Sequence, residues 1–437
     1  MTKAQEQIEH LMHLLHVEKK ADYEQYQQKM LNTSIDERRR KGVTWYPIVL
    51  TEQNLGTGDR FTLTFERTSH FKEQHAFQVG AVVSLFTGAH EQVHLAQGVI
   101  SYVRENRIRV VLNGSQLPDG LGQGKLGLNL LFDEGSYKEM FRALKSVKNI
   151  ERGRLADLRE TFYAALPIQF QNGFEYQSVY LNPAQNKALS HIFNARDIAI
   201  IHGPPGTGKT TTLVHAIKEV VKQERQVLVC AQSNAAVDLL VEKLAQQGIR
   251  VLRMGHPARL TPEAVENSLD VKMEQHGLYK ELKSVRIKHQ QYKEMSFKYK
   301  RNFGHNERMQ RDLLRKEARL FKEDAERIEQ TISQDLLDDA EVIAATLVGC
   351  THHLLTDRTF KTVFIDEASQ ALEPAAWIAI AKGYRVMMAG DHLQLPPTVK
   401  SMEAARGGLA LTLFEKAIHL PEASVMLNQQ YRMHPDI

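Results

Sequence analysis

The segment that most constrains the fold is glycine-rich: Gly203-Pro204-Pro205-Gly206-Thr207-Gly208-Lys209-Thr210. It fits the phosphate-binding pattern G-x-x-x-x-G-K-[ST] at every fixed position. Residues 197–202 before it predict a buried strand, and residues 211–222 after it predict a helix. Glycines let backbone N–H groups turn toward phosphate oxygens, and a helix start adds the positive end of its dipole. A glycine-rich turn that binds nothing is the alternative, but the strand and helix on the expected sides favour a site for ATP or GTP. The expected nucleotide contacts are Gly203, Pro204, Pro205, Gly206, Thr207, Gly208, Lys209, Thr210 and Thr211.

Four side chains in two segments have the chemistry of triphosphate hydrolysis. Lys209 is expected to reach the β- and γ-phosphates, and the Thr210 hydroxyl to take a position on Mg²⁺. Residues 362–365 predict an apolar strand that ends in Asp366 and Glu367. We expect Asp366 to hold Mg²⁺ through its water shell and Glu367 to polarise the attacking water. Acidic residues often end strands, so this pair alone would be weak evidence. The phosphate loop in the same α/β region is what favours a catalytic role.

A further polar residue, Gln394, lies in Gly390-Asp391-His392-Leu393-Gln394-Leu395-Pro396-Pro397, after the next predicted strand. Its neutral amide could sense the γ-phosphate without competing for the metal, although a plain turn would look similar. Cys350-Thr351-His352-His353 raises the possibility of a zinc site. No second Cys/His pair lies nearby in the sequence, so we do not expect one.

Composition bounds the class of protein. At 437 residues the chain should hold about three domains. It has no apolar run long enough to span a bilayer, and its polar start argues against a secretory signal. Cys230 and Cys350 are the only cysteines, which fits a reducing compartment and buried positions rather than a disulfide. These features predict a cytoplasmic protein without a membrane partner.

Periodicity divides the chain into regions. Residues 1–42 predict a stalk helix, residues 43–118 alternate with period two as in a small β-barrel, and residues 133–166 predict a second stalk helix. From residue 168 onward, apolar strands alternate with helices. The predicted strands are residues 198–201, 227–231, 342–346, 362–365 and 385–389. This alternation predicts an α/β fold with a parallel sheet covered on both faces. It occupies residues 168–261 and 336–437.

A helical insertion at residues 262–335 interrupts the α/β region. A heptad-like stripe begins at Leu278 and Leu282, and a second stripe is expected at Leu313 and Leu320. We predict a hairpin with arms about 40 Å long. Residues 271–330 contain 16 lysines and arginines against 10 acidic residues, so the remainder of the chain is slightly acidic. A solvated helical face would explain this surplus, and so would contact with a polyanion.

Taken in order, these segments resemble the motifs of superfamily 1 helicases, in the subgroup of the nonsense-mediated-decay and immunoglobulin-mu-binding helicases. The resemblance covers nearly the whole chain and departs mildly at Gln232, where the family usually has proline. The matching segments are 181–185 (the Q motif), 203–210 (motif I), 231–238 (motif Ia), 253–259, 345–349, 366–370 (motif II), 390–397 (motif III) and 430–435 (motif IV).

The resemblance implies further roles. Gln185 reads adenine, Tyr431 stacks on the base and Arg432 reaches the γ-phosphate. The α/β region becomes a RecA-like ATPase domain, and the barrel and the insertion become accessory domains. The implied activity is ATP-driven 5′-to-3′ translocation by a monomer along single-stranded DNA or RNA, with ATP and Mg²⁺ as cofactors. The residues expected to contact that strand are Ser233, Asn234 and Thr346, supported by the basic hairpin.

The resemblance also implies a second RecA-like domain after motif IV, and the sequence stops at Ile437. We therefore expect a partial helicase whose own ATP hydrolysis is very slow. Two other functions stay open. One is a nucleic-acid-binding module that uses ATP only as a conformational switch, which an intact Glu367 argues against. The other is a P-loop ATPase that acts on protein partners. Backbone contacts would serve DNA and RNA alike.

Overall fold

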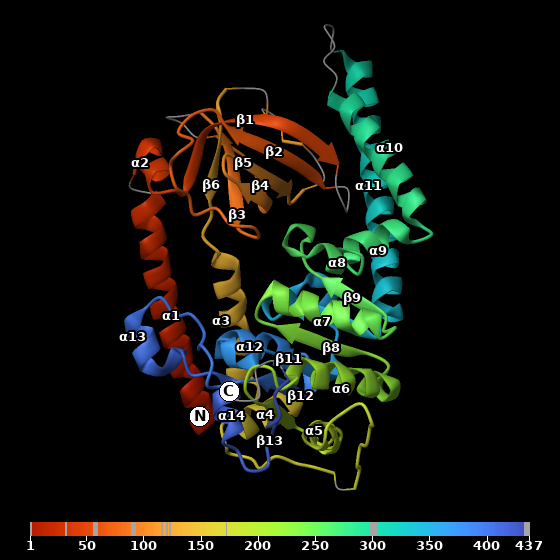
Figure 1. Ribbon diagram of the computed structural model, residues 1–437. Helices are drawn as coiled ribbons and strands as arrows, with labels where there is room; N and C mark the ends of the chain where they lie inside the picture. Colours follow the sequence, from red (N-terminus) through yellow and green to blue (C-terminus); the bar gives the residue numbers. More distant parts are fainter. Residues whose placement is uncertain are drawn as a thin grey trace.

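A computed structural model of the chain describes residues 2–30, 33–55, 60–88, 93–114, 117–118, 121, 124–171, 173–297 and 304–431. The molecule has three parts (Figure 1). A β-barrel lies at one end of two long helices, the parallel sheet and its helices form the body, and a helical hairpin projects from the body beside the barrel. Among the described helices, none is both long and apolar enough to cross a membrane. Arg432 and most of the glycine-rich segment at 118–124 lie outside the described residues.

The body contains a seven-stranded sheet in the order β13-β7-β12-β11-β8-β10-β9, and its paired strands are parallel. Five strands match the predicted ones: β7 (Ile198–His202), β8 (Val227–Ala231), β10 (Val342–Thr346), β11 (Phe360–Asp366) and β12 (Gly383–Gly390). The two edge strands, β9 (Val251–Met254) and β13 (Ser424–Met426), are short additions. The predicted parallel α/β sheet is confirmed.

Helices cover both faces of this sheet. One hydrophobic cluster joins the sheet to α5 (Pro183–Asn194), α6 (Lys209–Glu224) and α7 (Asn234–Gln246). The other face packs against helices from distant parts of the chain, namely α1 (Lys3–Met30), α3 (Glu134–Asn149), α4 (Arg154–Phe162), α12 (Glu373–Ile380) and α14 (Leu413–Ile418). The stalk helices therefore also cover one face of the seven-stranded sheet.

Each predicted stalk is two helices rather than one. The first stalk restarts at α2 (Ile35–Arg40), where Ser34 caps the helix by accepting the Glu37 N–H at 3.3 Å. The second breaks between α3 and α4, where Gly153 has a φ of 99°. Periodicity did not predict these breaks because cap residues leave the apolar pattern on either side unchanged.

The barrel is closed by six strands in the order β1-β2-β5-β4-β3-β6. They are β1 (Thr44–Leu55), β2 (Phe61–Arg67), β3 (Val82–Thr87), β4 (Val93–Arg104), β5 (Arg107–Leu112) and β6 (Leu126–Leu130). The predicted end at residue 118 is wrong, because β6 completes the barrel by pairing with β1 and β3. Gly127 lies inside β6. A Cβ at this position would come within 2.3 Å of the Phe86 ring.

The insertion contains α8 (Pro262–Val265), α9 (Leu269–Gln275), α10 (Tyr279–Phe297) and α11 (His305–Asp339). The hairpin arms have 19 and 35 residues, so they are about 28 and 52 Å long rather than equal. Leu282 is buried as predicted, but Leu313 and Leu320 are exposed. The second stripe is wrong because another heptad series of α11 carries buried side chains instead: Ala318, Ala325 and Ile332.

Candidate nucleotide and nucleic-acid site

The predicted hydrolytic residues meet at one edge of the sheet, where the parallel strands end. The phosphate loop follows β7, Asp366 ends β11, and Gln394 follows β12. A cavity of about 190 Å³ lies between these segments. Its lining consists of Pro205, Gly206, Gly208, Lys209, Thr210, Thr211, Leu239, Lys243, Glu367 and Gln394. This is the edge at which ligands bind in open α/β sheets.

The phosphate loop has the conformation that its glycines permit. Gly206 and Gly208 have φ values of 85° and 82°, in the left-handed region that side chains disfavour. A Cβ on Gly203 would come within 2.6 Å of the Leu427 carbonyl oxygen, so this position also needs glycine. The Lys209 ammonium is held over the loop, donating to the Gly203 carbonyl at 2.7 Å and the Pro204 carbonyl at 3.3 Å.

The expected Mg²⁺ ligands are already in contact. Thr210 Oγ1 donates a hydrogen bond to Asp366 Oδ2 at 3.1 Å. Burial, with the neighbouring Glu367 charge adding to it, raises the pKa of Asp366 to about 6. A hydroxyl beside a buried carboxylate fits Mg²⁺, which takes one or two protein oxygens and completes its shell with water and phosphate. The bound metal would supply the positive charge that this carboxylate lacks.

Glu367 and Gln394 line the same cavity from separate strands. Glu367 has a φ of 50°, in the left-handed region, and its side chain accepts a hydrogen bond from Gln370 Nε2 at 3.2 Å. Strained backbone of this kind concentrates at functional sites. Gln394 Nε2 donates to Asp391 Oδ2 at 3.0 Å, which holds the amide at the end of β12. Their roles in hydrolysis stay predictions.

The residues expected to bind the base lie together beside the loop. Gln185 Oε1 accepts the Asn182 N–H at 3.0 Å in a capping box at the start of α5. Its amide nitrogen faces Gly208, 2.7 Å from where a Cβ would stand. Tyr431 donates its backbone N–H to the Gly206 carbonyl at 2.9 Å, and its hydroxyl accepts from Asn182 Nδ2 at 2.7 Å. The two predicted base contacts, Gln185 and Tyr431, are therefore joined through Asn182 and the loop.

The three residues predicted to contact nucleic acid lie at the ends of neighbouring strands: Ser233 and Asn234 follow β8, and Thr346 is the last residue of β10. Each also makes a hydrogen bond within the protein. Ser233 Oγ caps α7 by accepting the Ala236 N–H at 3.2 Å. Asn234 Oδ1 accepts from Arg253 Nη2 at 2.9 Å. Thr346 Oγ1 accepts the Gly349 N–H at 3.0 Å. These bonds hold them at the sheet edge that carries the nucleotide cavity.

Sequence reasoning did not single out the buried ion pair that supports this segment. Arg253 Nε contacts Asp238 Oδ1 at 2.8 Å, and the two side chains are 0% and 2% exposed. Asp238 also accepts the Thr261 N–H at 2.8 Å. An arginine within the apolar run Val251-Leu252-Arg253-Met254 was the available signal. Leu239 and Lys243 of α7, which line the nucleotide cavity, were also missed.

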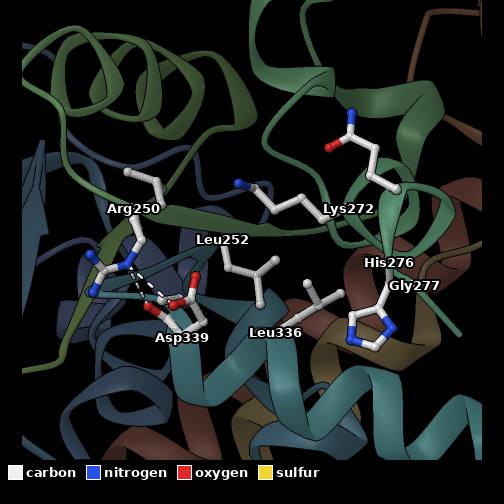
Figure 2. A pocket seen from close by; sticks show the side chains of 10 residues that line it. Arg250, Leu252, Lys272, His276, Gly277, Leu336 and Asp339 are labelled. Atoms are coloured by element: carbon white, nitrogen blue, oxygen red, sulfur yellow. Dashed lines mark hydrogen bonds and ion pairs between the residues drawn. The ribbon is translucent and has the colours of Figure 1, made fainter.

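A separate cavity of about 340 Å³ lies at the base of the insertion, between β9, α9 and α11. Figure 2 shows Arg250 turned toward Asp339, with Leu252 and Leu336 on the apolar side. Arg250 Nε lies 3.4 Å from Asp339 Oδ1, and Arg250 Nη1 lies 3.7 Å from Glu341 Oε2. None of the predicted site residues lines this cavity.

The two cysteines are buried and unoxidised, with their sulfurs 3.3 Å apart. Burial and the neighbouring Cys350 thiol raise the pKa of Cys230. In the part of the chain that the structure describes, no group of three or more His, Cys, Asp or Glu side chains is arranged to hold a metal.

Comparison with known proteins gives two family matches. A model described as an AAA domain matches residues 180–402, and one described as the 1B domain of helicase SMUBP-2/HCS1 matches residues 8–128. The second match reaches into β6, in agreement with the closed barrel.

Whole-chain relatives agree with these matches. The chain is 31% identical over 449 residues to the DNA-binding protein SMUBP-2 of Mesocricetus auratus, covering 98% of this chain and 44% of that protein. It is 29% identical over 425 residues to the DNA polymerase alpha-associated DNA helicase A of Schizosaccharomyces pombe, covering 91% and 61%. It is 35% identical over 260 residues to the ATP-dependent helicase NAM7 of Saccharomyces cerevisiae, covering 58% and 24%. The chain thus spans less than two thirds of the length of each of these relatives.

Proposed function

Because the chain belongs to the superfamily 1 helicases related to SMUBP-2 and NAM7, we propose that it couples ATP hydrolysis to 5′-to-3′ movement along single-stranded DNA or RNA, and so to unwinding. The observation that carries this proposal is the convergence of hydrolytic residues on one cavity. Ser233 follows β8 and Thr346 ends β10 of the same sheet, and both are expected to contact the nucleic-acid strand. Nucleotide chemistry and strand contact therefore share one rigid support.

In this proposal each polar residue has one task. Lys209 and the loop N–H groups bind the phosphates. Thr210 and Asp366 would hold Mg²⁺, which would supply positive charge next to the phosphate oxygens. Glu367 orients the attacking water and accepts its proton, and Gln394 contacts the γ-phosphate. Gln185 and Tyr431 favour adenine over guanine.

The distribution of charge supports a nucleic-acid partner. The distal part of the hairpin, residues 283–320, contains 12 lysines and arginines against 4 acidic residues. The base of the same arm, residues 321–339, contains 2 against 7. Because phosphate backbones release counterions on binding cations, a basic surface of this kind binds them in a salt-dependent way. We propose that the protein acts as a monomer in the cytoplasm and that the hairpin supports the strand.

A second candidate is a nucleic-acid-binding module in which ATP acts only as a switch. Glu367 in the cavity favours hydrolysis, because a switch that does not hydrolyse ATP needs no carboxylate to accept a proton from the attacking water.

Nucleotide binding and single-turnover hydrolysis, measured separately with and without single-stranded DNA or RNA, test the proposal. We expect Lys209→Ala to weaken binding of a fluorescent ATP analogue by about tenfold or more, roughly 1.4 kcal/mol. Glu367→Gln should bind ATP like the wild type and lose hydrolysis. If Glu367→Gln hydrolyses ATP at the wild-type rate, the switch is the better description. If nucleic acid neither binds nor changes ATP turnover, the translocase proposal is wrong.

A further inference from the structure

The nucleotide cavity has a second lysine in its wall. Lys243 lies on α7, one helical turn after Leu239, and both residues line the cavity. Lys209 is the other basic residue of this lining. Residues four apart project from the same face of a helix, so this wall of the cavity is one face of α7. Lys243 is half-buried. Its location thus combines partial loss of solvent with proximity to the phosphate loop.

The Lys243 ammonium has no protein partner within the described chain. Neither a hydrogen bond nor an ion pair to it is found among those residues. Its neighbours on the helix are occupied with one another, since Gln246 Nε2 donates to Glu242 Oε1 at 3.1 Å. By contrast, Lys209 is satisfied by two loop carbonyls. Because no described protein group holds the Lys243 ammonium, this cation can contact an anionic ligand in the cavity.

The ligand whose charge fits Lys243 is the nucleoside triphosphate expected at the phosphate loop. The cavity is also lined by the loop residues Gly206, Gly208 and Lys209 to Thr211, and by Glu367 and Gln394. A triphosphate brings crowded negative charge into this space, which a point-charge ammonium on a flexible stem can reach.

We propose that Lys243 is a second phosphate-binding residue of the nucleotide site, contacting triphosphate oxygens from the α7 side of the cavity. The inference rests on the proposed function, because it requires that a nucleoside triphosphate occupies the loop. It adds a residue outside every motif named in the sequence.

The same helix carries residues of the expected strand contact. α7 begins at Asn234 and is capped by Ser233, and it ends at Gln246. The buried pair of Arg253 and Asp238 holds its first turns against β9. The 13 residues of α7 span about 20 Å along the helix axis. A phosphate bound to Lys243 therefore contacts the helix that positions Ser233 and Asn234. The affinities for ATP and for single-stranded nucleic acid become linked through α7.

The first experiment measures affinity for ATP, ADP and adenosine in Lys243→Gln and in wild type, by competition with a fluorescent ATP analogue. We expect ATP affinity to fall about tenfold, a smaller loss for ADP, and unchanged adenosine affinity. Lys243→Arg should restore ATP affinity because it keeps the cation. Lys222→Gln serves as the matched control, since Lys222 is exposed on α6 and pairs with Glu219.

Outcomes separate the inference from the function on which it rests. If the wild type binds ATP and Lys243→Gln binds it equally well, the inference is overturned and the proposed function stands. If adenosine affinity falls as far as ATP affinity, Lys243 is structural and the inference is also overturned. If the wild type fails to bind ATP, the proposed function fails, and the inference fails with it.

A second measurement tests the linkage. The affinity for a fluorescent single-stranded oligonucleotide is compared with and without a non-hydrolysable ATP analogue. We expect the analogue to change this affinity in wild type and in Lys243→Arg, and to change it several-fold less in Lys243→Gln. An equal change in Lys243→Gln, at saturating analogue, would contradict a role for α7 in coupling.

Discussion

At the scale of single residues, the nucleotide site contains a charge that the fold does not fully compensate. Asp366 is 3% exposed, and its carboxylate accepts one hydroxyl hydrogen bond from Thr210 and the Glu367 backbone N–H. Burial and the adjacent Glu367 oppose ionisation of this group, which raises its pKa to about 6. Such a cost at a functional residue is expected where the charge is needed to bind a cation rather than to stabilise the protein.

Replacing Asp366 with asparagine should therefore stabilise the protein while disabling it. The amide keeps an acceptor for Thr210 and removes a buried charge, so we expect the free energy of unfolding without Mg²⁺ to rise by on the order of 2 kcal/mol. Hydrolysis of ATP should fall more than a hundredfold because the metal is lost. Thermal unfolding with and without Mg²⁺ measures the first effect. A variant that is less stable than wild type in the absence of Mg²⁺ would contradict this account.

At the scale of elements, the start of α7 is held by a residue from another element. Its first turns are held by Arg253 on β9, which contacts Asp238 and Asn234 together. Since both partners of the pair are almost fully buried, the loss of one leaves an uncompensated charge. The hydrophobic pattern of α7 predicts that the helix packs on the sheet. It does not predict the position of the first turn, which Arg253 holds.

Replacing the Arg253–Asp238 ion pair should show that the stability of the protein and its binding of single-stranded nucleic acid can change separately. We expect Arg253→Met alone to cost about 3–5 kcal/mol of unfolding free energy, because Asp238 is left buried and unpaired. The double variant Arg253→Met with Asp238→Leu should recover most of that loss. It should still bind single-stranded nucleic acid more weakly, because Asn234 has lost its anchor.

Chemical denaturation and oligonucleotide titration of the single and double variants check this prediction. Wild-type strand affinity in the stable double variant would show that Asn234 needs no support from Arg253.

At the scale of the whole molecule, positive charge lies far from the sheet. The hairpin of α10 and α11 projects beside the barrel (Figure 1), and residues 283–320 hold the basic surplus. The rest of the chain is acidic on balance, since it contains the remaining 44 lysines and arginines against 48 acidic residues. In the proposed function, an extended arm would place that charge along a nucleic acid away from the nucleotide cavity.

Neutralising the outer face of the arm should weaken nucleic-acid binding and its dependence on salt. The variant Arg308→Gln, Arg315→Gln, Lys316→Gln and Arg319→Gln removes four exposed cations. If they contact phosphates, the slope of log affinity against log salt should decrease in magnitude by about 2 to 3, at roughly 0.7 per contact with a single strand. The control is Lys322→Gln with Arg327→Gln, which removes two exposed cations from the acidic base of the same helix. An unchanged slope in the fourfold variant would leave the arm without a role in binding.

The joint between the barrel and the body should respond to acid. His256 lies where Arg259 Nε donates to the Gly80 carbonyl of the barrel at 3.1 Å. Burial, with Arg60 and Arg259 nearby, lowers the pKa of His256 to about 3. A histidine with a lowered folded pKa is neutral when folded, so the stability it contributes is present above its unfolded pKa of about 6.5 and is lost as pH falls toward 3.

We therefore expect the unfolding free energy to fall by roughly 1 kcal/mol through this histidine between pH 6.5 and 5.5. The variant His256→Asn keeps an acceptor for the Ala258 N–H, which His256 Nδ1 accepts at 3.2 Å. Its stability should depend less on pH in that window. Thermal melts from pH 7.5 to 5 measure the difference, and identical pH profiles would contradict the assignment.

What could be predicted from sequence depended on how local each interaction is. The phosphate loop, Asp366 and Glu367 lie directly at the ends of their strands, so the neighbouring sequence was enough to predict them. The alternation of strands and helices was enough to predict a parallel sheet. The exposed Leu313 shows the limit. Its spacing to Leu320 suits a packed helix, yet another heptad series of α11 is the one that faces α10.

By itself, the sequence determined the α/β class, the family and the set of candidate hydrolytic residues, because these depend on short stretches with fixed backbone geometry. Only the tertiary structure decided that β6 closes the barrel, that Arg253 holds Asp238 and Asn234, and that Lys243 lines the nucleotide cavity. Each of these is a contact between residues from different elements. Hydrophobic periodicity says which face of an element is buried, and it does not say which other element covers that face.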